Sequence, residues 1–127
     1  MQEQNLYEYA VIRVLPVVER EEFINAGVIL FCKKAKFIRV HFYIAETKWR
    51  LFSEDLDVEQ VRLNLISLQK IANGDRESGP IAQMDLPSRF RWLTAVRSSV
   101  IQTSRPHPGL SYDLDATAKR LFRELVL

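Results

Sequence analysis

The stretch YEYAVIRVLPVVEREEFINAGVILFCKKAKFIRVHFYI, residues 7–44, decides the fold class. Its three apolar segments, 7–15, 24–32 and 37–44, are rich in the β-branched and aromatic residues that are typical of strands. The first segment is apolar on both faces, which predicts an interior strand. The connection KKAK has the length of a hairpin loop. In the third segment we expect the apolar even positions to face the core and the odd positions to face outward, namely Arg39, His41 and Tyr43.

Helical patterns follow the three strands. Asp57 and Gln60 resemble a capping box, and apolar residues then recur at helical spacing up to Gly74, which can end a helix in the left-handed conformation. The patterns also predict a short helix over 86–95 and a last helix over roughly 114–126.

Between those two helices the sequence predicts one more strand and one irregular segment. The fourth strand is expected at SSVIQT, residues 98–103. The segment SRPHPG, residues 104–109, is expected to be irregular because two prolines and a glycine disfavour ladder hydrogen bonds. The fold class is therefore α+β: one domain over residues 1–127, with an antiparallel sheet of three to four strands, built on the N-terminal hairpin, packed with two main helices.

Composition indicates a soluble cytoplasmic protein. Of the 127 residues, 47% are hydrophobic and 27% charged, which is ordinary for a globular chain. Cys32 is the single cysteine, so no disulfide can form within the chain, and we interpret it as a buried thiol in a reducing compartment. The N-terminus lacks a signal-peptide pattern, and the longest apolar runs fall short of the ~20 residues of a membrane helix, so no membrane contact is expected.

The net charge of +2 conceals a local asymmetry. From Leu86 to Tyr112 there is no acidic residue, although four arginines and a histidine fall inside. Guanidinium groups match phosphate and carboxylate geometry, and hydroxyls add donors. The candidate anion-binding residues are Arg97, Ser98, Ser99, Arg105 and His107. In the alternative reading the arginines cover the sheet and pair with the EREE carboxylates, above all Glu21 and Glu22, in a purely structural role.

Two stretches resemble a known bacterial family. YEYAVIRVLPVVEREEFINAGVILFC, residues 7–32, and RFRWLTAVRSSVIQTSRPHPGL, residues 89–110, are similar to the N- and C-terminal signatures of domain of unknown function family 3037. The likeness runs from about Leu6 to Leu125. Val96 stands where the family commonly has proline, and Pro108 where threonine is usual. The resemblance implies no activity, but members are often encoded beside proteins similar to HipA-type serine/threonine kinases, which implies a partner.

Three functions remain open from the sequence. The first is a non-catalytic interaction or accessory module for a HipA-type kinase-like partner. The second is an anion or nucleic-acid binder that uses the basic segment 89–107. The third, the least favoured, is a hydrolase or nuclease built on Glu21, Ser99 and His107, for which no nucleophile elbow and no residue to orient the histidine are evident.

The sequence predicts no cofactor and no metal. The four glycines are scattered and form no phosphate-binding loop. The carboxylates of residues 19–22 lack the ligand spacing of a metal site, and we interpret them as solvated charges on a connection. The oligomeric state is left open.

Overall fold

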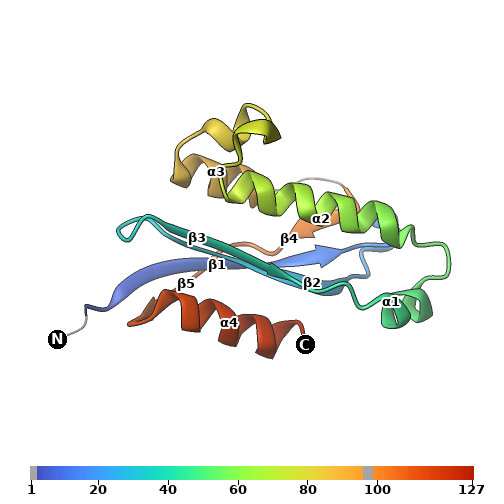
Figure 1. Ribbon diagram of the computed structural model, residues 1–127. Coiled ribbons are helices and arrows are strands. Elements are labelled where there is room, and N and C mark those ends of the chain that lie inside the picture. Colours follow the sequence, from blue (N-terminus) through green and yellow to red (C-terminus); the bar gives the residue numbers. More distant parts are fainter. Residues whose placement is uncertain (1–2, 96–98) are drawn as a thin grey trace.

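The computed structural model describes residues 3–95 and 99–127, which form an antiparallel five-stranded sheet with helices on both faces (Figure 1). The strand order is β3-β2-β1-β4, and β5 also pairs with β1. The predicted α+β class is confirmed, with more strands and helices than expected. The strands are β1 (Asn5–Val14), β2 (Ile24–Cys32), β3 (Phe37–Phe42), β4 (Ile101–Thr103) and β5 (His107–Ser111). The α-helices are α1 (Glu46–Phe52), α2 (Val58–Ala72), α3 (Leu86–Leu93) and α4 (Leu114–Leu125).

β1 is interior, as its two apolar faces predict. Ala10, Ile12 and Val14 pack into the core that lies under α2 and α3. Tyr7 packs on the other face, in a smaller core under α4. The hairpin of β2 and β3 continues the sheet, and a bulge at Ala26 shifts the β1–β2 register. Because β1 is covered on both faces and paired on both edges, it holds the two layers of helices together.

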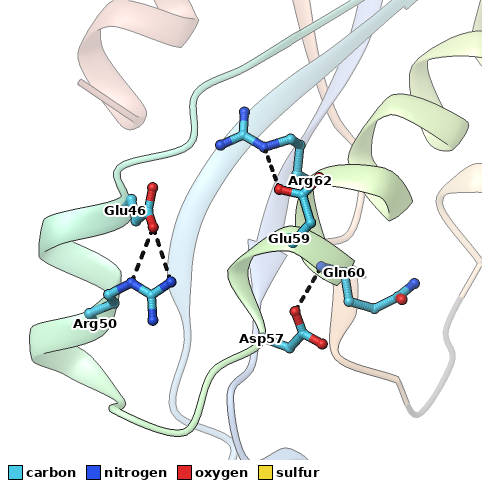
Figure 2. A network of polar contacts seen from close by, with 6 residues as sticks. All are labelled: Glu46, Arg50, Asp57, Glu59, Gln60 and Arg62. Atoms are coloured by element: carbon cyan, nitrogen blue, oxygen red, sulfur yellow. Dashed lines mark hydrogen bonds and ion pairs between the residues drawn. The ribbon is translucent and has the colours of Figure 1, made fainter.

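α2 begins and ends where its sequence signals predict. The Asp57 carboxylate accepts a hydrogen bond of 3.0 Å from the backbone N–H of Gln60 (Figure 2), which satisfies one of the free amides of the first turn. Asn73 follows the last helical residue, and Gly74 has a φ of 76°. The short helix α1 was not predicted. It forms before α2 and buries Trp49, which is 1% exposed.

The outward face predicted for β3 is partly wrong, because α4 covers it. Arg39 donates to the Asp115 carboxylate over 2.7 Å, and the His41 ring lies 5.6 Å from the Phe122 ring. Tyr43, the residue after β3, is exposed as predicted. The physical reason is that β2 is apolar on both faces, so its second face also needs a covering layer.

The irregular segment predicted over residues 104–109 is only partly confirmed: residues 104–106 are irregular, but His107–Ser111 is β5. Val11 turns its N–H and C=O toward the edge segment, where both bond to Ser104. Because backbone groups alternate along a strand, the N–H and C=O groups of Tyr9 and Tyr7 point to the same edge of β1 as those of Val11. Their partners on β5 are His107 and Gly109. Pro108, which lies between these partners, therefore points its nitrogen away from β1, and its missing N–H costs the ladder nothing.

Candidate functional site

The edge of the sheet beside β1 holds three of the predicted site residues, Ser99, Arg105 and His107, and a β-bulge divides it. Thr103 pairs with Ile12 and His107 with Tyr9, so three edge residues, 104–106, face two residues of β1. Ser104 fixes the bulge: its hydroxyl accepts the N–H of Val11 over 2.9 Å and donates to the carbonyl of Arg105 over 3.0 Å.

Ser99 lies on the α2 side of this edge. Its hydroxyl donates to the carbonyl of Ile101 over 2.6 Å, and the residue lines a pocket with a volume of about 330 Å³. One wall of the pocket is a stripe of α2 at helical spacing: Asn64, Ser67, Leu68 and Ile71. The end of α3 and the edge segment 99–103 form the other walls.

Arg105 and His107 lie beyond the bulge. Arg105 is exposed, and among residues 3–95 and 99–127 no carboxylate pairs with it. His107 is exposed too, and its ring lies 5.4 Å from that of Tyr9, on the α4 face of the sheet. Ser99 and His107 are thus brought to opposite faces, an arrangement that does not form a nucleophile–base pair. Arg97 and Ser98 lie outside the described residues.

Two other arginines of the acid-free segment make internal contacts. Arg91 binds Glu8 through two hydrogen bonds, of 3.0 and 2.6 Å, and so ties α3 to β1. Arg89 donates to the carbonyl of Met84 over 2.7 Å, and its guanidinium packs beside Gly74 at the end of α2. Arg91 is therefore paired with a glutamate of β1, Glu8, which the sequence did not single out.

Glu21 and Glu22 lie in the connection between β1 and β2, and both are exposed. Glu21 ends a short 3-10 turn with a φ of 58°, and Glu22 forms an ion pair with Arg20. The predicted pairing of these carboxylates with the arginines of the acid-free segment is not seen for Arg89, Arg91 or Arg105, and Arg97 lies outside the described ranges.

A groove with both apolar and polar lining residues adjoins this connection, and the sequence did not point to it. It has a volume of about 330 Å³ and is lined by Pro16, Val17, Arg20, Glu22 and the end of α1, Leu51–Ser53. Leu51 is 85% exposed because it follows the buried Trp49 by two residues, about 200° around the helix. We call Val17, Leu51 and Phe52, all at least 45% exposed, the apolar patch.

The fold also shifts the pKa of His41. Burial beneath α4 lowers this pKa below its ordinary value of 6.5, and the neighbouring Arg39 lowers it further. Asp115 opposes the shift and Lys119 adds to it. The Nε2 atom of His41 is buried and makes no hydrogen bond.

A family comparison covers almost all of these elements. The sequence model of the family described as protein of unknown function (DUF3037) matches residues 9–126, from β1 to the residue after α4. The chain belongs to the DUF3037 family. The two stretches of the DUF3037 resemblance, 7–32 and 89–110, meet in space, because β4 and β5 pair with β1. No curated protein and no solved structure matches the chain.

Two further properties of the DUF3037 chain concern the residues described. Within 3–95 and 99–127, no three His, Cys, Asp or Glu side chains are grouped so that they could hold a metal ion. None of the helices in those ranges combines the length and hydropathy needed to cross a bilayer. Cys32 is buried at the end of β2.

Proposed function

We propose that this DUF3037 protein is a non-catalytic accessory subunit that binds a protein partner through the apolar patch. The supporting observation is the patch itself. Three large apolar side chains from two separate segments line one groove, and the Arg20–Glu22 ion pair lines it as well. An apolar centre with a polar rim is the usual anatomy of a protein–protein interface.

Two contacts of α1 fix the backbone that carries Leu51 and Phe52. Arg50 donates from Nε and Nη2 to the Glu46 carboxylate over 3.2 and 3.0 Å, along α1 (Figure 2). Trp49 anchors the same helix in the core, so Leu51 is presented to solvent with little freedom to turn inward. A binding surface whose backbone is fixed before association loses less entropy on binding, which favours Leu51 as an interface anchor.

The partner we propose is a HipA-type kinase-like protein, because members of the family are often encoded beside one. The test is co-expression with the neighbouring kinase-like protein, followed by size-exclusion chromatography and a measurement of Kd. The wild-type pair should co-elute at micromolar concentration. Leu51→Asp should weaken binding at least about thirtyfold, the effect of a hot spot of about 2 kcal/mol.

Leu63→Asp is the matched control. Leu63 is 53% exposed on α2 and lines neither the groove nor the pocket. It should leave the Kd within about twofold of wild type. Separate elution of the wild-type proteins, or an equal loss in both variants, contradicts the proposal.

A second candidate function rests on Arg105 and His107, which are exposed two residues apart on the same edge. We propose anion binding there, tested with a labelled single-stranded oligonucleotide at low and moderate salt. Arg105→Ala should reduce both the affinity and its salt dependence. Arg123 is an exposed residue of α4, so Arg123→Ala removes the same charge elsewhere on the surface and should not change the affinity comparably. Equal effects of the two variants would contradict this proposal, because the oligonucleotide would then respond to the net charge of the protein and not to a site at Arg105 and His107.

A further inference from the structure

The pocket between α2, α3 and β4 carries an inference independent of the apolar patch. α2 and α3 cover one face of β1, β2 and β3: Phe90 stacks on Phe31, Arg91 binds Glu8, and both helices contact β3. β4 lies at the opposite end of the four-strand path from β3, and there the pocket opens between α2, the end of α3 and the edge segment 99–103. Ile101 and Val100 from the edge, with Leu68 and Ile71 from α2, are only partly buried against the core and form an apolar floor.

Polar groups line the rim of the same pocket. Asn64 accepts a 3.1 Å hydrogen bond from Gln60 through its side-chain oxygen, and its two amide N–H donors have no partner among the described residues. The Ser67 hydroxyl makes no hydrogen bond among the described residues. Ser99 donates to Ile101 and so keeps its oxygen available as an acceptor. Donors therefore gather on the α2 side of the rim, above an apolar floor.

The lining also sets the charge and the size of a ligand. Within the described residues, no charged side chain lines the pocket. Among these residues a charged ligand would lose hydration without gaining a partner, so the described lining favours a neutral ligand. The volume of about 330 Å³ lies at the lower end of the range for ligand pockets, about 300–1,000 Å³, which suits one ring system. Trp92 at the end of α3 adds an aromatic side chain to the wall.

We propose that this pocket binds a neutral, planar heteroaromatic molecule of the size of a single nucleobase. Its ring lies on the apolar floor, and its acceptor atoms face the donors of Asn64 and Ser67. This pairing of an apolar face with a few convergent polar groups is how small-molecule sites fix both affinity and orientation.

The experiment uses the two tryptophans as reporters in an NMR titration. Trp92 lines the pocket, so its indole signal can report a ligand there, whereas Trp49 is buried in the core and does not line the pocket. Adenine and uracil are the probes. Each should produce a saturable shift of the Trp92 signal with a Kd of about 1 mM or tighter, while the Trp49 signal stays in place. The signals are assigned with Trp92→Phe.

Two variants at exposed positions of α2 form a matched pair. Ser67→Phe fills the pocket and should abolish the shift by either probe, whereas Lys70→Phe, outside the lining, should leave it unchanged. Asn64→Leu should weaken binding about five- to tenfold, the effect of losing one hydrogen bond.

Three results would overturn the inference. The first is the absence of a saturable Trp92 shift up to about 5 mM of either nucleobase. The second is a shift that persists in Ser67→Phe. The third is tighter binding of benzoate, an anionic ring, than of either nucleobase, which would contradict the argument from the neutral lining.

Discussion

Replacing Ser104 with alanine tests how the edge of the sheet is built. The Ser104 hydroxyl is the partner of the Val11 N–H, over 2.9 Å, at a point where the ladder is interrupted by the bulge. Ser104 is 6% and Val11 8% exposed, so water cannot readily take the place of the hydroxyl. A buried N–H left without an acceptor costs about 1–3 kcal/mol.

The expected result is a loss of about 1–3 kcal/mol in the free energy of unfolding. For a chain of this length that corresponds to a decrease in Tm of about 4 °C per kcal/mol. Urea denaturation followed by circular dichroism gives the free energy, and an unchanged m-value indicates that the unfolded state is not affected. Hydrogen exchange of the Val11 amide should accelerate in the same variant.

Ser67→Ala is the control, since Ser67 is exposed and makes no hydrogen bond within the described ranges. It should change the stability by less than about 0.5 kcal/mol. A change equally small in Ser104→Ala would refute the reasoning, because it would mean that the bulge does not depend on the serine hydroxyl.

Further predictions concern β5 and His41. Gly109→Ala should destabilise the protein by about 1–3 kcal/mol in the same urea assay, because a Cβ there would lie within 3 Å of the Tyr7 ring; full stability would show that the ring moves aside freely. Pro108→Ala should lower the stability by no more than about 1 kcal/mol, the effect of a more flexible unfolded chain, because the restored N–H points away from β1 and adds no ladder bond; a gain in stability would contradict the assigned strand alternation. Because the pKa of His41 is lowered in the folded protein, the unfolded chain protonates this imidazole at higher pH than the folded chain does. The free energy of unfolding should therefore fall as pH decreases through about 6.5. Denaturation at several pH values should show that His41→Gln loses this part of the dependence; an unaltered profile would assign it to other groups.

The strands of the N-terminal hairpin could be predicted because their apolar periodicity is local and long. The two layers of helices could not be predicted in the same way. The odd residues of β3 look solvent-facing in isolation, and only α4, more than seventy residues later in the chain, places Asp115 beside Arg39. A pattern within one strand contains no information about which distant helix will cover it.

β5 was missed for a different reason. Prolines and a glycine usually interrupt a strand, but whether Pro108 removes a ladder bond depends on the register with β1. That register follows from the bulge at Ser104, which no local pattern marks. In the candidate site, Ser99, Arg105 and His107 were predicted together because they are close in sequence, whereas the two faces of the sheet separate Ser99 from His107. The apolar patch and the pocket each combine segments distant in the chain, so neither could be predicted from spacing.

Hydrogen exchange of the chain with and without its kinase-like neighbour tests the proposed function most directly. If the apolar patch is the interface, complex formation should slow exchange in α1 and in residues 16–23, while β5 and α4 should be unchanged. Protection confined to β5 or α4, with α1 exchanging as in the free protein, would contradict the account.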